Sequence, residues 1–367
     1  TGTTWLDMIA VKPVPPPTAV TVTTLASSGA GSLREAVEII APDGTITFDP
    51  ALAGGTILLT SGPLVVDKPL TIDGSGAPGL SLSGGDADRV LIVEPTGDAT
   101  VSHLTLKDGY GWQVGGAVLN NGTLTLDHVT VTSSTMATDA GDFWQGGGGI
   151  YNGDGATLNL VDSAVTDNVS GWTGAGVYSF FNTTTTIIRS TISGNLALDV
   201  AGGMRILGNG EIVNSTISGN TSTTWHGGAL FLTDGAMTVL NSTIVGNHAP
   251  SGTTGGLFVG TFGTSNASLS LQNSIVANNG DFGCLAGYFG AGTVTLTSLG
   301  NNVLTDGTCA PVGSDQIVAD AGLGALADNG GPTWTHALLA GSVAIDAANT
   351  AVCPPTDQRG ITRDAAC

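Results

Sequence analysis

A seven-residue phrase recurs through the middle of this chain and limits the folds open to it. Its clearest copies read NSTISGN and NSTIVGN, and related copies read RSTISGN and DSAVTDN. The copies begin at Asp162, Arg189, Asn214, Asn241 and, in a weaker form, Asn273, so that successive starts lie 27, 25, 27 and 32 residues apart. Repeats of this length, built from short β-branched runs and glycine turns, are typical of a β-solenoid with one coil per repeat.

The composition agrees with stacked coils rather than with a globular core. Aromatic residues make up 5% and charged residues 10% of the 367 residues, whereas glycine alone occurs 57 times. Thin coils need aliphatic ladders and tight turns, and a stack can lengthen without forming a new core. We therefore expect an all-β parallel helix of about ten coils. Residues 1–20 would form an extended Pro-rich arm, 21–300 the β-helix with its N-terminal cap, and 301–367 a C-terminal cap region.

A short capping helix is expected just after the arm. Ser32 is a suitable N-cap, Glu35 follows it three residues later, and apolar residues from Leu33 to Ile40 recur with helical spacing. The first coil of a solenoid exposes open strand edges and unfilled interior, so a capping element is required there.

Four cysteines, Cys284, Cys309, Cys353 and Cys367, lie in the last quarter of the chain. They lack the paired spacing of a zinc site. Pairing in sequence order, Cys284 with Cys309 and Cys353 with Cys367, is the simplest of three connectivities. Disulfides indicate an oxidising, extracellular or cell-surface location.

The charge of the chain limits its partners. A net charge of −20, with nine basic residues, disfavours nucleic acid and anionic membranes. The apolar runs are too short for a transmembrane segment, and no signal peptide is expected in this sequence. A glycan or cell-surface polymer and self-association remain as candidate partners.

Two segments carry a family resemblance. The stretch GSLREAVEIIAPDGTITF at 31–48 resembles the CSLREAI-type N-terminal segment of bacterial surface β-helix proteins, with Gly31 in place of the cysteine. The ending NGGPTWTHALLAGSVAIDAANTAVCPPTDQRGITRDAAC at 329–367 is similar to the choice-of-anchor Q region. The resemblance implies a right-handed parallel β-helix on a cell surface, and it implies little about chemistry.

Aromatic residues recur beside the glycine groups of successive coils. Four tryptophans each precede such a group, and a second row follows it at positions that strand alternation should turn outward. Adjacent coils lie about 4.8 Å apart, so these rings could form an apolar strip suited to sugar rings. The alternative is that the rings only stack on one another beneath a loop. The two rows comprise Trp112, Trp144, Trp172 and Trp225, then Tyr151, Tyr178, Phe231 and Phe258.

One coil interrupts both rows, with Asp199 at the tryptophan position and Arg205 at the aromatic position. The pair suggests a polar site or a structural salt bridge. A glycoside hydrolase or polysaccharide lyase would need paired carboxylates across a groove or a basic group. Asp199, Arg205 and Asp142 are the catalytic candidates for such an enzyme, although no motif of those enzymes is present.

The last asparagine of each phrase should fall at the same bend and form an internal ladder, because asparagine tolerates left-handed geometry and offers both donors and acceptors. The ladder comprises Asn168, Asn195, Asn220, Asn247 and Asn279.

No cofactor is expected, with calcium kept as the one candidate because acidic residues gather in the early turns. These residues are Asp73, Asp86, Asp88, Asp98 and Asp108.

Three functions follow from these observations. The leading one is a secreted or surface rod, structural or adhesive, that contacts glycan or a neighbouring copy along the aromatic strip. A polysaccharide-degrading enzyme is the second. The third is a subunit of an extracellular filament, in which residues 1–12 add a strand to the open edge of another copy.

Overall fold

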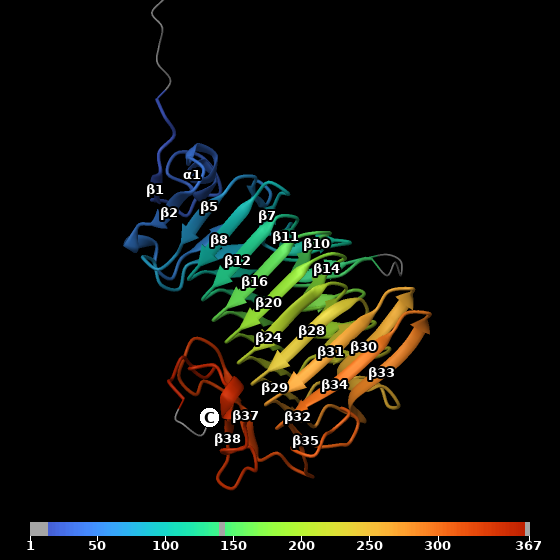
Figure 1. Cartoon of the computed structure of the whole chain (residues 1–367). Coiled ribbons are helices and arrows are strands. Elements are labelled where there is room, and N and C mark those ends of the chain that lie inside the picture. Colours follow the sequence, from blue (N-terminus) through green and yellow to red (C-terminus); the bar gives the residue numbers. More distant parts are fainter. Residues whose placement is uncertain (1–13, 139–143, 364–367) are drawn as a thin grey trace, which may run out of the picture.

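The chain folds as a parallel β-helix, and the computed structural model describes residues 14–138 and 144–363. Each regular coil contributes one strand to each of three parallel sheets, A, B and C, and the coils stack in sequence order (Figure 1). Sheets A and B contain 11 strands each, which fits the expected number of coils. The predicted fold class is therefore confirmed. The filament arm, residues 1–12, lies outside the described residues.

Sheets A and B form two of the long faces. Sheet A contains β1 (Ala19–Val22), β2 (Gly44–Phe48), β5 (Leu70–Asp73), β8 (Asp98–Ser102), β12 (Thr123–Asp127), β16 (Thr157–Val161), β20 (Thr184–Ile188), β24 (Asn209–Val213), β28 (Gly235–Leu240), β31 (Ala267–Gln272) and β34 (Val294–Gly300). Sheet B contains β3 (Thr56–Leu58), β6 (Ser81–Ser83), β9 (Thr105–Lys107), β13 (Thr130–Thr132), β17 (Ala164–Thr166), β21 (Thr191–Ser193), β25 (Thr216–Ser218), β29 (Thr243–Val245), β32 (Ile275–Ala277), β35 (Val303–Leu304) and β36 (Gln316–Ile317).

The remaining strands form sheets C and D and one antiparallel pair. Sheet C contains β4 (Leu64–Val66), β7 (Leu91–Val93), β11 (Val118–Asn120), β15 (Ile150–Asn152), β19 (Val177–Ser179), β23 (Met204–Ile206), β27 (Leu230–Leu232), β30 (Thr254–Gly263) and β33 (Phe282–Gly290). The short sheet D contains β10 (Tyr110–Trp112), β14 (Thr135–Ala137), β18 (Val169–Ser170), β22 (Leu196–Ala197) and β26 (Thr221–Ser222). The antiparallel pair is β37 (Leu323–Ala327) with β38 (Thr335–Leu338).

Aliphatic ladders fill the interior. In sheet A, Leu160 lies opposite Ile187, which lies opposite Ile212 in the next coil, and all three side chains are fully buried. Strand alternation places these residues inside and their neighbours outside, as in the alternating burial of β16. Each buried aliphatic side chain stabilises the fold by roughly 1.5–3 kcal/mol.

The first end of the rod is covered by α1 (Leu33–Ile39), as the sequence predicts. The Ser32 side chain accepts a hydrogen bond from the Glu35 main-chain N–H at 3.2 Å, and the Glu35 carboxylate accepts one from the N–H of Gly31 at 2.6 Å. The buried face of α1 contacts β1, β2 and β4, the first strands of sheets A and C. The helix therefore closes the open edges at this end.

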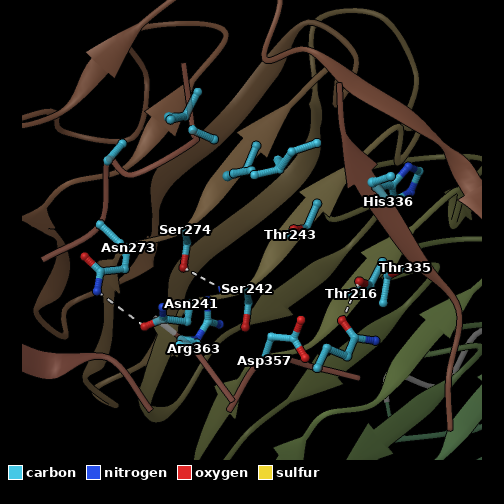
Figure 2. A pocket seen from close by; sticks show the side chains of 18 of the residues that line it. Thr216, Asn241, Ser242, Thr243, Asn273, Ser274, Thr335, His336, Asp357 and Arg363 are labelled. Carbon is cyan, nitrogen blue, oxygen red and sulfur yellow. Dashed lines mark hydrogen bonds between the residues drawn. The ribbon is translucent and has the colours of Figure 1, made fainter. Parts of the chain in front are cut away.

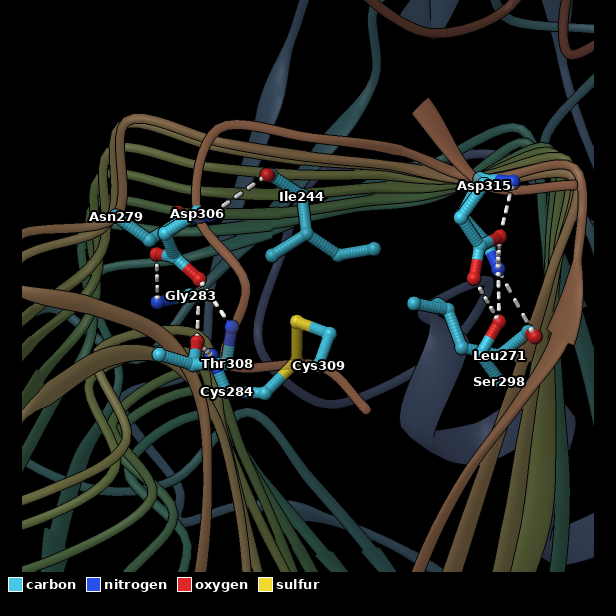
Figure 3. Close-up of a disulfide and its surroundings, with 11 residues drawn as sticks. Ile244, Leu271, Asn279, Gly283, Cys284, Ser298, Asp306, Thr308, Cys309 and Asp315 are labelled. Atoms are coloured by element: carbon cyan, nitrogen blue, oxygen red, sulfur yellow. Dashed lines mark hydrogen bonds between the residues drawn. A yellow bond between two sulfur atoms is a disulfide. The ribbon is translucent and has the colours of Figure 1, made fainter. Parts of the chain in front are cut away.

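A disulfide closes the interior at the other end. Cys284 faces inward from β33 and bonds to Cys309, which lies on the segment crossing the end of the rod, and both side chains are buried (Figure 3). Thr308 Oγ1 and the Asp306 carboxylate accept hydrogen bonds from the main-chain N–H groups of Cys284 and Gly283. The first predicted pairing is confirmed. Cys367 lies outside the described residues, so its pairing with Cys353 stays a prediction.

Residues 333–363, here called the C-terminal strap, do not cover the end of the rod but fold back along the outer side of sheet B (Figure 1). The Nδ2 groups of Asn301 and Asn214 donate to the carbonyl oxygens of Ala347 and Thr356, at 2.9 and 2.8 Å. Within the predicted cap region, 301–367, the end of the rod is therefore closed by the segment around Cys309 and by Asp315 and β36, and the strap takes a different position.

Candidate functional site

Trp112 and Trp144 are the most exposed members of the predicted aromatic rows. In the strand register Trp112 pairs with Ala137 of the next coil, whereas Trp144 lies two residues before Gly146, which pairs with Val114. Their side chains are 48% and 47% exposed. Trp144 also packs against Phe180 and Phe181, with ring centroids 5.5 Å away in both cases.

The tryptophan row loses its regularity beyond this pair. Gly146 pairs with Thr173, which moves Trp172 one position out of step with Trp144, and Trp172 is only partly exposed. Trp225 is also partly exposed, because it packs against Phe289 and Phe231 at 4.9 and 6.0 Å. The expected continuous strip is therefore not formed, and the two most exposed indoles, Trp112 and Trp144, do not share a register position.

The second aromatic row is buried, which corrects the prediction of an exposed strip. Its side chains leave the coil interior as alternation predicts, but Tyr178, Phe231 and Phe258 are almost completely covered and Tyr151 is buried as well. The rings stack along sheet C: the centroids of Phe231 and Phe258 lie 4.6 Å apart and their planes are nearly parallel.

Glycines in the loops that lead into sheet C explain this burial. A Cβ atom on Gly146 would lie 2.4 Å from Cδ1 of Tyr178, and one on Gly227 would lie 2.8 Å from Cβ of Phe231. The main chain of these loops thus lies directly on the rings. We expect only glycine to permit so close an approach. The repeated glycines therefore bring the loops over the aromatic row.

Arg205 occupies the same row and is 1% exposed. Its guanidinium lies between the rings of Tyr178 and Phe231, at 5.4 and 5.7 Å from their centroids. Nε and Nη1 are buried without a hydrogen-bond partner. Burial lowers the pKa of Arg205, and the nearby charges of Tyr178 and Asp199 act in the opposite direction.

Asp199 does not bind Arg205 directly, since no ion pair joins them within the described part of the chain. Burial raises the pKa of the Asp199 carboxyl, and the positive charge of Arg205 partly offsets this rise. An inaccessible guanidinium cannot touch a polymer substrate, so the structure does not support Arg205 as a catalytic residue. Of the other two candidates, Asp199 is partly buried and stays a prediction, and Asp142 lies outside the described residues.

The terminal asparagines of the phrase form a continuous buried ladder. Asn195 Nδ2 donates to Oδ1 of Asn220 at 2.9 Å and to the carbonyl oxygen of Val165 at 2.9 Å. The same Asn220 Oδ1 accepts the main-chain N–H of Asn195 at 3.1 Å. The pattern runs from Asn168 to Asn279, and its role is structural.

A second ladder was missed at the sequence level. The serine that follows the first residue of each phrase accepts a hydrogen bond from the main-chain N–H of its counterpart in the preceding coil, as Ser215 does from Ser190 at 3.1 Å. Its signal was present in the repeated phrase, where serine holds a fixed place. The ladder comprises Ser163, Ser190, Ser215, Ser242 and Ser274.

A cleft of about 560 Å³ lies between sheet B and the C-terminal strap (Figure 2). Its charged lining is internally paired: Arg359 donates to the Asp357 carboxylate at 2.6 and 2.8 Å, and Arg363 Nη2 donates to Asn214 Oδ1 at 2.8 Å. The buried amide of Gln358 bonds Thr216 and Thr191. These bonds fasten the strap to the rod.

The early aspartates do not gather as calcium ligands among the described residues. The one set of potential ligands there is Asp127, His128 and Asp162, whose ligand atoms lie within 4.8 Å of one another. Arg189 already holds both carboxylate oxygens of Asp162, at 2.8 and 2.5 Å. The guanidinium charge opposes a cation at this position, so the set forms an ion-pair cluster.

The fold and these contacts define the chain as a parallel β-helix protein. No family model matches the chain, and neither a curated protein nor a solved structure is similar enough to count as a match. None of the helices in residues 14–138 and 144–363 is long and apolar enough to cross a membrane.

Proposed function

We propose that the chain is a secreted or cell-surface rod whose outer face contacts glycan through Trp112 and Trp144. The stacked coils supply an elongated scaffold, and the buried Cys284–Cys309 disulfide favours an oxidising compartment. The resemblance of residues 31–48 and 329–367 to surface β-helix proteins points the same way.

The observation that carries this proposal is the exposure of two large indoles, each two residues before one member of the Val114–Gly146 pair that joins adjacent coils. The other aromatic side chains of the two predicted rows are buried or partly buried, so Trp112 and Trp144 are the most exposed of them. An exposed indole presents a flat apolar face to which a sugar ring can bind. The net charge of −20 repels acidic polymers, so a neutral glycan is the fitting partner.

The test is binding of the purified chain to an array of neutral and acidic glycans, followed by affinity measurements on any neutral glycan retained. Trp112→Ala combined with Trp144→Ala should weaken binding at least about tenfold, because truncating a central aromatic contact removes upwards of about 1–2 kcal/mol. Trp334→Ala is the matched control, since Trp334 is 57% exposed but lies on the strap.

Two results would contradict the proposal. One is a double variant that binds as tightly as the unmodified chain while its circular dichroism spectrum is unchanged. The other is an array on which no neutral glycan is retained. Release of shortened or unsaturated sugars from the same glycans would favour the enzyme alternative instead.

A further inference from the structure

Within residues 14–138 and 144–363, the nine-residue strand β33 presents a long uncovered edge. This strand ends sheet C at the disulfide end of the rod, where it pairs on one side with β30 alone (Figure 1). The segment around Thr308 covers only its first residues, through the bonds to Gly283 and Cys284. Residues 285–290 therefore present main-chain donors and acceptors at an open edge, a ready template for a further strand.

Two other sheet ends are at least partly shielded. At the opposite end of sheet C, α1 contacts β4, and the Arg34 guanidinium donates to the carbonyl oxygens of Gly62 and Pro63. The last residues of β34 are covered by Asp315, whose carboxylate accepts a hydrogen bond from Ser298. Beyond Cys284, no hydrogen bond from another described segment covers the open edge of β33, and no charged residue occurs between Phe282 and Leu304.

The missing charge matters because lysine, glutamate and proline on an edge strand are the usual protection against pairing with another chain. None of the 29 acidic residues of the chain lies within this stretch, and along β33 a carboxylate reaches the edge only at Gly283, from Asp306. A partner strand that pairs with this edge should itself lack acidic residues, because the net charge of −20 would repel them. The same uncharged strand of a second copy meets this requirement.

The direction of the main-chain groups fixes how two copies can pair. The N–H of Cys284 points to the open end, toward Thr308, whereas the N–H of Ala291 points back to Gly263 in β30. Main-chain groups alternate along a strand, so those of Ala286 and Tyr288 also point to the open edge. In an antiparallel pair centred on Gly287, Ala286 of one copy exchanges hydrogen bonds with Tyr288 of the other.

The same register brings apolar side chains together. Leu285 and Phe289 lie on the outer face of β33, beside Phe258 and Phe262 of β30. Phe289 is 40% exposed, and its ring lies 5.5 Å from that of Phe262. With Gly287 at the centre, Leu285 of each copy lies opposite Phe289 of the other, a cross-strand pair that stabilises antiparallel sheets.

We infer that two copies of this chain associate end to end, by antiparallel pairing of their β33 strands about Gly287, into a closed two-fold dimer. In such a dimer the β33 edge of each copy is occupied by the other copy. The opposite end of sheet C is covered by α1, so this contact does not extend into a filament. The inference concerns the end of the rod and stands apart from glycan binding at Trp112 and Trp144.

The first test is sedimentation equilibrium of the full chain, whose protein mass is 36.3 kDa, from about 1 µM to about 1 mM. We expect a monomer–dimer equilibrium. Ala286→Pro removes an N–H that faces the open edge and leaves the bonds to β30 in place, so it should weaken dimerisation at least about tenfold. Val65→Lys is the control, because Val65 is an exposed residue on the opposite edge strand of sheet C.

A second set of variants tests the register. Leu285→Glu and Phe289→Lys should each weaken the dimer, and the double variant should restore it, because the proposed register places each introduced charge opposite its counterpart. Thermal unfolding of each variant checks that the monomer remains folded. A monomer throughout the concentration range, a dimer insensitive to Ala286→Pro, or assemblies that keep growing with concentration would each overturn the inference. Glycan binding by the Ala286→Pro variant separates this test from the one on the tryptophans.

Discussion

Replacing Asn220 by alanine tests the account of the internal ladder most directly. Its side chain is fully buried and takes part in four hydrogen bonds. Nδ2 donates to the Ile192 carbonyl oxygen at 2.9 Å and to Asn247 Oδ1 at 2.8 Å. Oδ1 accepts the main-chain N–H and the Nδ2 of Asn195. Alanine removes all four bonds at once.

The expected loss of stability depends on which hydrogen bonds the partners of Asn220 retain in the alanine variant. The Nδ2 of Asn195 retains its bond to Val165, and Oδ1 of Asn247 retains the main-chain N–H of Asn220. The N–H of Asn195 has no other acceptor among the described residues. A buried group left without a partner costs about 1–3 kcal/mol, and each further bond contributes about 0.5–1.5 kcal/mol. We expect Asn220→Ala to lower the free energy of unfolding by about 3–5 kcal/mol.

The assay is urea unfolding followed by circular dichroism, with hydrogen exchange to locate the effect. Thr238→Ala is the control, because Thr238 is exposed and its 3.4 Å contact with Ser270 should be worth less than about 0.5 kcal/mol. Exchange should accelerate first in the coils that contain Asn195, Asn220 and Asn247, since each coil contacts only its neighbours. A loss below about 1 kcal/mol, or one equal to that of the control, would refute the view that the ladder holds the coils together.

Two further predictions concern the disulfide end. Replacing both Cys284 and Cys309 by alanine should lower the free energy of unfolding by about 3.5 kcal/mol, the chain-entropy value for their sequence separation of 25, and an unchanged urea midpoint would contradict it. At Asp315, burial alone would raise the pKa, but hydrogen bonds from Ser298, Val312 and Asn302 hold it below the usual 3.8. This contribution to stability is present above pH 3.8 and is lost as the pH falls through the lower folded-state pKa. Urea unfolding in that acidic range should therefore show a smaller pH dependence for Asp315→Asn than for the unmodified chain, and equal slopes would be evidence against the prediction.

The repeated phrase made the coil predictable because it fixes several positions of the coil at once. Its serine and its last asparagine each recur at one bend, and the apolar residues between them face inward, as Ile192, Ile217 and Ile244 do. The capping helix was equally readable, since Ser32 and Glu35 are local signals that need no distant partner.

The burial of the second aromatic row was not predictable from alternation. Strand alternation predicts that the Tyr178 side chain points out of the coil interior, but it does not predict whether a loop covers that side chain. The cover comes from loops of the same and neighbouring coils, and the tight approach at Gly146 is a three-dimensional property of their path. The exposure of an outward residue therefore depends on the loop length around it.

The C-terminal strap escaped prediction for a different reason. It has no repeat, and its partners lie far away in the sequence: the Thr191 hydroxyl donates to the carbonyl oxygen of Trp334, and Asn214 Nδ2 donates to that of Thr356. Asn214, Asn241 and Asn273 begin successive phrases in left-handed geometry. The repeated phrase shows that these asparagines are aligned, but it does not show that the C-terminal strap binds them.

The strap also sets which part of the rod is free to change in length. Among the described residues, its hydrogen bonds reach the coils from Arg189 to Asn301 and none earlier. An extra coil inserted before Asp162 would extend both ladders and leave every strap contact in place. The same insertion between Asn214 and Asn241 would move one set of strap partners by about 4.8 Å and separate them from their asparagines. Duplication of a coil in the first half of the molecule would therefore lengthen the rod, whereas the strap fixes the number of coils in the second half.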